Sequence, residues 1–224
     1  AVQRHLLQDV SFDLRRREIL GIGGLLGAGR TELLETIFGA RGGRVSGEII
    51  IEGVLCTLAS PEEAVEHGLA LITEDRKNTG LLLNFDINDN VALPLLARWS
   101  WAGIPSFKRI TTETKSKIHQ LGIRCSGPEH VVGTLSGGNQ QKVVLSKWLA
   151  TNPRILLLDE PTRGVDIGAK DEIYQLIGQL ADQGLSIVIA SSEIPELMAV
   201  CDRLIVLCEG RKIGELTKKQ FSAD

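Results

Sequence analysis

The sequence has little that would suit a membrane-spanning or nucleic-acid-binding chain. No apolar run approaches the ~18 residues that a membrane-spanning helix needs, and no signal-peptide pattern opens the sequence. Lysine and arginine number 25 against 28 acidic residues, which gives a net charge of −3. No basic run is long enough to suggest an arm for nucleic acid, so we expect no nucleic acid among the partners. A role at a membrane would require docking onto another subunit.

Cysteine is also scarce. The four cysteines are Cys56, Cys125, Cys201 and Cys208. None forms a C-x-x-C pair, and no histidine lies near them at a metal-ligand spacing. We therefore expect all four to be buried, small apolar side chains in a reducing compartment.

The remaining composition is that of a globular protein with a substantial core. Of the 224 residues, 43% are hydrophobic and 24% are charged, and a chain of this length buries a core without disulfides or metals. Periodicity predicts strands over residues 10–14, 18–22, 47–53, 69–73, 155–158, 186–190 and 204–207. It predicts helices over residues 31–38, 61–67, 169–181 and 194–200, and a helix that follows Gly137 and ends at Ala150. This alternation indicates an α/β fold with a mostly parallel, doubly wound sheet and an antiparallel β part near the N-terminus.

The middle of the chain, about residues 82–132, has a different pattern. It lacks strand signals and shows helical patterns near residues 88–98 and 111–121. An irregular connection marked by Trp99, Trp101, Pro105 and Phe107 joins them. We expect a helical subdomain inserted into the α/β core, so that residues 1–224 form one domain.

The first motif lies between a predicted strand and a predicted helix. Its residues are Gly24, Leu25, Leu26, Gly27, Ala28, Gly29, Arg30 and Thr31, followed by Glu32. It matches G-x-x-x-x-G-K-[ST] except that Arg30 replaces lysine. Glycines let backbone N–H groups turn toward phosphate oxygens, and the helix N-terminus adds a positive dipole. Thr31 would ligate Mg²⁺. The alternative interpretation is a glycine turn before a helix with no ligand.

The second motif is a short apolar run that ends in two acids. Residues 155–158 form a buried strand, and Asp159, Glu160 and Pro161 follow. Asp159 would hold Mg²⁺, and Glu160 would orient or deprotonate an attacking water. The alternative is a strand that ends in a solvated acidic turn.

The third motif is a serine and two glycines at the start of a helix. It comprises Leu135, Ser136, Gly137, Gly138, Asn139 and Gln140. A helix start of this kind is a second place where backbone N–H groups can bind an anion. The alternative is a plain helix start with serine as the cap.

In this order the motifs resemble those of the ABC ATPase superfamily. Residues 24–31 are similar to its Walker A motif, 135–140 to its signature, 155–160 to its Walker B motif and 164–166 to its D-loop. The resemblance implies an ABC-type P-loop NTPase fold and an ATPase with ATP and Mg²⁺ as cofactors. It adds Asp166 and the signature residues to the expected nucleotide contacts.

A narrower resemblance is carried by residues 73–77, 135–142, 161–166 and 191–193. These segments look like the sugar-importer ATPases of the ribose, galactose and xylose type, which carry two ATPase domains in one chain. This sequence resembles the C-terminal domain. Because it begins at Ala1 without methionine, we expect it to be a piece of a longer chain.

Three positions depart from the superfamily pattern. Arg30 replaces the P-loop lysine, Glu74 stands where a glutamine senses Mg²⁺ and the membrane subunit, and Ser192 stands where a histidine contacts the γ-phosphate. Arginine keeps the charge but is a planar fork, and a misplacement of about 1 Å can cost roughly 10²-fold in rate. We expect this domain to bind nucleotide but hydrolyse it slowly, while its signature completes the partner's site. Alternatively, Glu74 pairs with Arg76 or Lys77 at the surface, and Ser192 caps a helix.

The resemblance also implies partners. They are the N-terminal ATPase domain or a second copy, transmembrane permease subunits and, indirectly, a periplasmic or extracellular sugar-binding protein. The implied location is the cytoplasmic face of a prokaryotic cell membrane. Residues 82–90 mix apolar and polar side chains where the permease would dock. The alternative for this stretch is internal packing of the helical subdomain.

Two other functions compete with sugar import. A soluble ABC ATPase of DNA repair or translation is one, although residues 32–134 hold no sustained heptads of the kind that a long coiled-coil insert would require. A regulatory half that binds nucleotide without hydrolysing it is the other. The sequence does not name the sugar. An aromatic residue before the first strand usually stacks on adenine, and His5 is the candidate here.

Overall fold

The computed structural model describes residues 7–42 and 46–221. The chain divides into two compact units. The first comprises the residues up to Leu71, Arg154–Glu160 and the residues from Gly178, and the second comprises Ile72–Pro153 and Pro161–Ile177. His5 lies outside the described residues.

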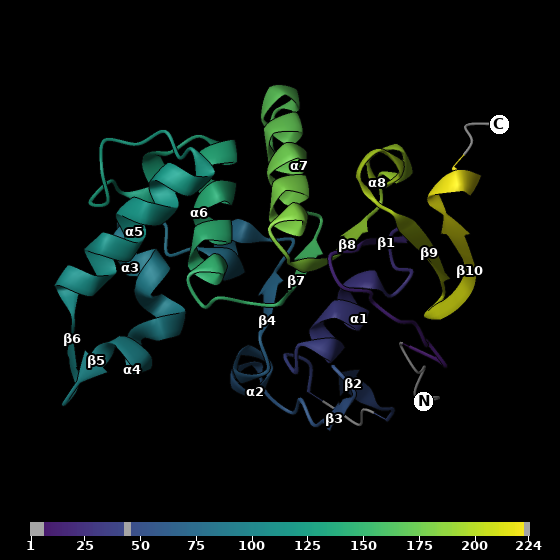
Figure 1. The fold of residues 1–224 in the computed structure, drawn as a ribbon. Helices are drawn as coiled ribbons and strands as arrows, with labels where there is room; N and C mark the ends of the chain where they lie inside the picture. The colour runs from purple at the N-terminus through teal and green to yellow at the C-terminus, as the bar shows by residue number, and fades with distance from the viewer. Residues whose placement is uncertain (1–6, 43–45, 222–224) are drawn as a thin grey trace, which may run out of the picture. The chain divides into compact units, whose positions relative to one another are not determined.

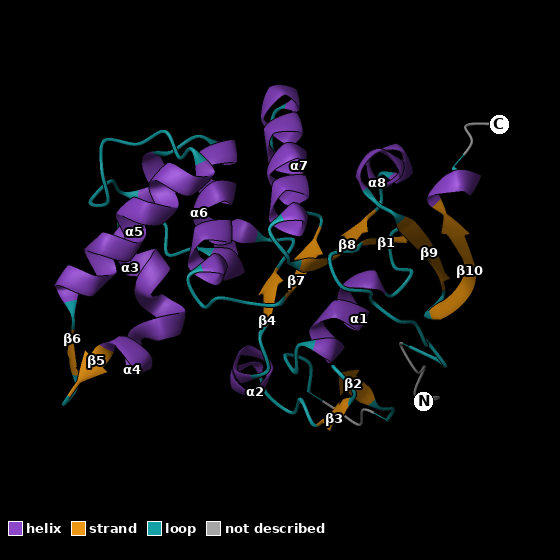
Figure 2. Cartoon of the chain, in the orientation of Figure 1, coloured by secondary structure: helices purple, strands orange, loops and turns teal. Residues whose placement is uncertain are grey.

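A six-stranded sheet forms the core of the first unit (Figures 1 and 2). Its strands, in the order β10-β9-β1-β8-β7-β4, are Arg211–Thr217, Arg203–Cys208, Ile19–Gly23, Ser186–Ser191, Ile155–Asp159 and Leu69–Ile72. Strand β1 runs parallel to β8 and β9, β7 runs parallel to β8, and β10 is antiparallel to β9. Strands β1 and β8 are buried along their whole length, as expected for parallel strands covered on both faces.

Three helices and a hairpin complete the first unit. The helices are α1 (Arg30–Ile37), α2 (Pro61–Glu66) and α8 (Ile194–Val200), and the hairpin consists of β2 (Ile49–Ile51) and β3 (Val54–Cys56). A 3₁₀ turn, η4 (Lys218–Gln220), follows β10, and α7 (Ile167–Asp182) runs from the second unit into the first.

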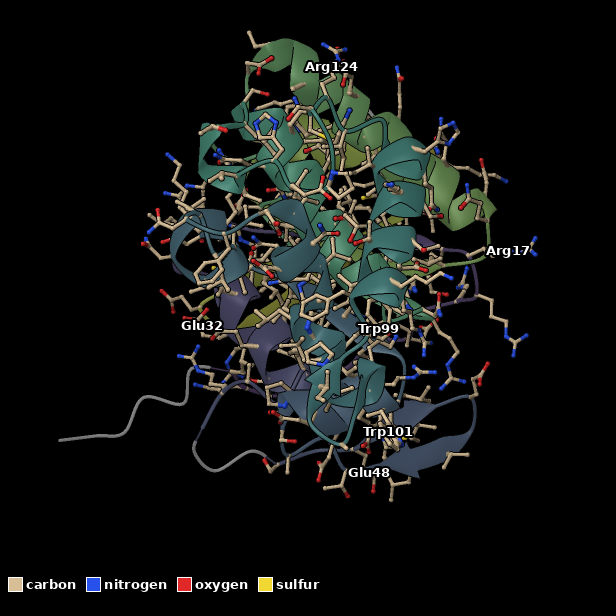
Figure 3. All side chains as sticks on the ribbon, turned by 90° about the vertical axis from the view of Figure 1, so that its left-hand side faces the viewer. Arg17, Glu32, Glu48, Trp99, Trp101 and Arg124 are labelled. Carbon is tan, nitrogen blue, oxygen red and sulfur yellow. The ribbon has the colours of Figure 1, made fainter. Side chains whose placement is uncertain are left out.

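The second unit is mainly helical. Helices α3 (Ile87–Ala92), α5 (Phe107–Leu121) and α6 (Gly137–Leu149) pack against one another (Figure 1). Its shorter elements are η1 (Arg76–Gly80), η2 (Leu93–Leu95), α4 (Leu96–Trp99), β5 (Ser100–Trp101), β6 (Ile104–Pro105) and η3 (Val132–Thr134). Trp99 is buried, whereas Trp101 on the β5–β6 hairpin is 84% exposed (Figure 3).

The α/β fold class with a mostly parallel sheet is confirmed, but three local predictions are wrong. Residues 10–14 alternate in burial as predicted, yet they form no strand. Side chains take the backbone carbonyls there, since Lys212 bonds Ser11 O (3.3 Å) and Arg203 bonds Asp13 O (2.6 Å).

The irregular connection predicted after Trp99 is the β5–β6 hairpin. The prediction that all cysteines are buried is wrong for two of them, because Cys125 is half-buried and Cys208 is exposed.

Candidate nucleotide-binding site

Strand register brings three chain segments together at one edge of the sheet. In the parallel ladders Gly23 pairs with Ser191, and Asp159 pairs with Ala190. The glycine-rich loop leaves β1 at this edge, Glu160 follows β7, and Ser192 follows β8. The carboxyl edge of a parallel sheet is where ligands bind in α/β folds. The glycine-rich loop and Glu160 therefore share one site, although Arg30 of the loop and Glu160 are 130 residues apart in the sequence.

The glycine-rich loop takes backbone angles that favour glycine. Gly27 and Gly29 have φ of 79° and 100°, in the left-handed region that costs other residues energy. At Gly24 a Cβ atom would lie 2.6 Å from Leu207 O. Gly29 occupies the cap position of α1 and supplies no side-chain acceptor, so N–H groups of the first turn stay open to an anion.

Leu25 and Leu26, at the tip of this loop, are 84% and 89% exposed. Glu32, in the first turn of α1, lies 3.9 Å from Arg41 as a loose ion pair. The exposed tip leaves the backbone of the loop accessible from solvent.

Asp159 and Thr31 form the part of the site that fits a magnesium ion. Asp159 is only 3% exposed, and its Oδ1 atom is buried without a hydrogen-bond partner. Burial is the main cause that raises the pKa of Asp159 to about 6, and the hydrogen bond with Thr31 acts in the opposite direction. An orphaned carboxylate oxygen beside a hydroxyl is the hard-oxygen donor set that Mg²⁺ prefers. The described residues hold no cluster of three or more His, Cys, Asp or Glu side chains, so further ligands would be phosphate oxygens and water.

Arg30 and Glu160 form a buried ion pair. Arg30 Nη1 lies 2.9 Å from Glu160 Oε1, and the two side chains are only 7% and 11% exposed. The same Oε1 accepts the backbone N–H of Ser192 (2.8 Å), and Oε2 accepts the hydroxyl of Ser191 (3.3 Å). Glu160 also has a φ of 46°, a conformation that costs a non-glycine residue about 1–3 kcal/mol. Its carboxylate is thus held from three sides.

Comparison with known sequences identifies the family. The sequence profile described as "ABC transporter" matches residues 7–163. The chain belongs to the ABC transporter family. This confirms the family resemblance inferred from the three motifs.

The curated relatives of this ABC transporter chain are longer than the chain itself. It is 50% identical over 213 residues, or 95% of the chain, to a protein named "Ribose import ATP-binding protein RbsA" from Streptococcus agalactiae serotype Ia. It is also 50% identical, over 93% of the chain, to the protein of that name from Geobacillus kaustophilus. The chain spans 43% and 42% of these relatives, which is less than half their length.

Solved structures share the fold at lower identity. An ATP-binding cassette of an ABC transporter matches with a TM-score of 0.84 and 22% identity, over 98% of this chain and 88% of that one. A nucleotide-free cassette matches with a TM-score of 0.83 and 20% identity, over 95% and 85% of the two chains. The chain therefore has the fold of ATP-binding cassettes. Every helix within the described residues is too short or too polar to cross a bilayer.

The family's signature residues lie in the second unit. Ser136 occupies the cap position of α6, but its hydroxyl caps no backbone group and instead accepts Asn139 Nδ2 (2.8 Å). Ser136, Gly138 and Asp166 line one polar cavity of about 270 Å³. The cavity also holds Arg124, Lys142 and Glu172, and Arg124 is labelled in Figure 3. Signature and D-loop residues thus share one hollow.

Gln140 and Leu135 face inward. The amide nitrogen of Gln140 donates to Val132 O (3.3 Å) and Leu135 O (3.1 Å), and both residues are buried. These bonds hold the turn before α6. The nucleotide contact expected of Gln140 and Leu135 stays a prediction.

The alternatives weighed for Glu74 and Ser192 need correction. Glu74 makes its ion pair with Arg163, because the guanidinium of Arg76 is turned inward to the backbone. The cap position of α8 is Glu193, one residue later than the Ser192 cap that the sequence suggested. Sequence reasoning also missed the Arg30–Glu160 pair, for which the only signal was an arginine in the lysine position.

Proposed function

We propose that this chain is an ATP-binding domain whose composite sites hydrolyse ATP to energise sugar import through a membrane permease. The observation that carries the proposal is the single sheet edge where the glycine-rich loop, Thr31 and the orphaned oxygen of Asp159 meet. Relatives that are 50% identical to the chain over 213 and 209 aligned residues are named ribose import ATP-binding proteins. The whole chain, residues 1–224, would act as one cassette with the helical segment 82–132 inserted.

In this function the loop residues 24–31 and Glu32 surround the phosphates of ATP. The open N–H groups of the loop and of the first turn of α1 bind phosphate oxygens, and Arg30 supplies positive charge. Thr31 and Asp159 hold Mg²⁺, together with phosphate oxygens and water. When bound, the ion neutralises charge on the phosphates.

The domain's own site hydrolyses ATP slowly. A general base has to reach the attacking water with a free carboxylate, but Glu160 already bonds Arg30, Ser191 and Ser192. A guanidinium is also wider than the ammonium that a P-loop normally holds. Nucleotide binding and hydrolysis therefore depend on different residues. Binding uses Asp159 and Thr31, whereas hydrolysis needs Glu160.

The signature of this chain serves the partner's ATP. Gly138 lets the start of α6 pack closely against Ala169, because a Cβ there would lie 2.7 Å from Ala169 Cβ. The cavity lined by Ser136, Gly138 and Asp166 is polar, and its two cations, Arg124 and Lys142, both pair with Glu172, so the backbone N–H groups at the start of α6 would be the main contacts to a phosphate. The partner is the N-terminal ATPase domain of the longer chain or a second copy.

The permease docks on the helical unit. A groove of about 340 Å³ is lined by Leu82, Phe85, Leu93, Leu96, Phe107 and Ile110, together with Asp86 and Asp89. Phe85, Leu93 and Phe107 are 50%, 44% and 71% exposed. An exposed apolar groove of this kind suits a short helix from a cytoplasmic loop. The chain would lie at the cytoplasmic face of the membrane, and the sugar-binding protein would act through the permease.

A soluble ABC ATPase of DNA repair or translation remains the second candidate. Its distinguishing features would be a long coiled coil or a basic surface. The longest helix of the inserted segment is α5, with 15 residues, and the chain has a net charge of −3. Both observations favour the transport function.

The test compares two substitutions in the complete protein that contains this chain. Gly137→Asp adds a side chain whose Cβ would lie 2.9 Å from Arg76 Nη2, and it adds negative charge to the helix start that is proposed to bind phosphate. We expect it to reduce steady-state ATP turnover to the slow rate of this domain's own site, whereas Glu160→Gln lowers turnover only slightly. If Glu160→Gln strongly lowered ATP turnover and Gly137→Asp left it unchanged, the roles assigned to the two residues would be wrong.

A further inference from the structure

Arg76 is a buried cation whose guanidinium, among the described residues, bonds to backbone carbonyls. It begins η1 directly after Glu74 and Asp75, and it is 8% exposed. Its Nη1 atom donates to Arg163 O (2.6 Å), and its Nη2 atom donates to Gly164 O (2.9 Å). Both carbonyls belong to the loop that leads to Asp166. The segment of Glu74 is thereby fastened to the D-loop.

The same guanidinium also lies against the start of α6. A Cβ atom on Gly137 would stand 2.9 Å from Arg76 Nη2 and 3.2 Å from Gly164 O. The signature glycine, the guanidinium and the D-loop carbonyl therefore occupy one small volume. A shift of any of them requires the other two to move, because interiors are close-packed.

The far end of η1 is tied to the same helix. Lys147, in the last turn of α6, donates to Gly80 O at 2.5 Å. A Cβ on Gly80 would touch Val144 Cγ2 at 3.4 Å. The five-residue turn is thus bonded to the D-loop segment at its start and to α6 at its end.

The bonding of Arg76 is costly for a merely structural residue. Its Nε atom is buried without a partner, and within the described ranges no carboxylate bonds its guanidinium. Burying a cation without a counter-ion is unfavourable, and an apolar side chain of similar size would fill the space at lower cost. An apolar side chain, however, would not donate hydrogen bonds to two carbonyl oxygens, as the planar guanidinium of Arg76 does.

We propose that Arg76 is a positioning residue that joins the segment of Glu74 to the signature and to the D-loop. The inference rests on the proposed function, because the site being positioned is the partner's ATP site. Ser136 and Asp166 line one cavity, and Arg76 contacts the segment next to each of them. The permease-docking groove follows the Glu74 segment in the sequence. A displacement of that segment therefore shifts both walls of the cavity together.

The experiment uses the complete protein with its permease in proteoliposomes and measures ATP turnover and nucleotide affinity. The variants are Arg76→Met, which keeps the volume and removes the fork, and Arg76→Lys, which keeps the charge with one donor centre. Lys115→Met, on the exposed side of α5, is the matched control. Turnover by the unaltered protein tests the proposed function separately, since its absence would refute that function whatever Arg76 does.

We expect Arg76→Met to lower kcat on the order of 10²-fold, as a misplacement of about 1 Å does, with KM for ATP changed less than about threefold. Arg76→Lys should recover part of kcat, and the thermal midpoint of both variants should stay near that of the Lys115→Met control. A wild-type kcat in Arg76→Met would overturn the inference. A kcat that falls only in proportion to the folded fraction, with no recovery in Arg76→Lys, would make Arg76 merely structural.

Discussion

Two neighbouring carboxylates at the end of β7 have opposite surroundings. Asp159 keeps a buried oxygen without a partner, whereas Glu160 accepts bonds from Arg30, Ser191 and Ser192. Asp159 has an oxygen that can bind a cation, whereas Glu160 is already paired with the guanidinium of Arg30. Asp159 is the last residue of β7, whereas Glu160 follows the strand with a φ of 46°, so the two adjacent acids have different surroundings.

This contrast predicts the effect of Arg30→Lys. In the complete protein, Gly137→Asp first silences the site that this chain's signature completes, so the remaining turnover comes from the site of Arg30. Adding Arg30→Lys replaces the fork by a compact ammonium and releases Glu160. We expect turnover to rise on the order of tenfold, a part of what a general base contributes, as measured by phosphate release.

Adding Glu160→Gln to that double variant provides the control. The gain should disappear, because it depends on the released carboxylate. A gain that survives Glu160→Gln, or no gain at all, would show that the ion pair does not limit hydrolysis.

At the scale of elements, α6 contains several buried polar side chains. Gln140, Gln141, Lys142, Ser146 and Lys147 are all buried. Burial lowers the pKa of Lys147 from 10.5 to about 8. Between these two values the unfolded chain holds a proton that the folded chain has released, so the free energy of unfolding rises with pH from about 8 to about 10.5.

Replacing this lysine should remove that dependence. Lys147→Met deletes a buried charge, and we expect the free energy of unfolding at pH 7 to rise by about 1–3 kcal/mol. Urea denaturation at pH 7 and at pH 9.5 measures it, and the difference between the variant and wild type should shrink at the higher pH. Lys115→Met should change neither value. A variant less stable than wild type at pH 7 would mean that the bond to Gly80 outweighs the cost of burial.

Elements with strong local signals could be predicted from the sequence. The start of α2 is an example, because Ser60 accepts from Glu63 N at the predicted cap and Pro61 takes the first position. The β5–β6 hairpin could not be predicted, since each strand has two residues and the turn depends on positive φ at Ala102 and Gly103. Strands that short have no readable alternation.

The site was predictable in its positions but not in its bonds. The loop at Gly24, the acids at Asp159 and the signature at Ser136 follow from motif and spacing. The partners of Arg30 and Arg76 lie 130 and 87 residues away, and no local pattern encodes contacts between such distant segments. The ion pair that restrains Glu160 therefore needed the structure.

At the scale of the whole molecule, the chain carries parts of two different sites. The first unit holds the glycine-rich loop with Thr31 and Asp159, and the second holds the signature and the apolar groove next to Phe85. Under the proposed function each part needs a companion domain, and the chain spans less than half of its curated relatives. Binding of nucleotide is the one step that the first unit supports by itself.

A calorimetric titration with Mg-ATP tests this account most directly. The account predicts saturable binding in the micromolar range, because the loop, Thr31 and Asp159 are formed although Arg30 pairs with Glu160. Thr31→Ala, which removes the hydroxyl beside Asp159, should weaken binding in the presence of Mg²⁺ and change it little without the ion. If the chain bound no Mg-ATP up to millimolar concentration, nucleotide binding by the first unit would be refuted. The chain would then act only by contributing its signature to the partner's site.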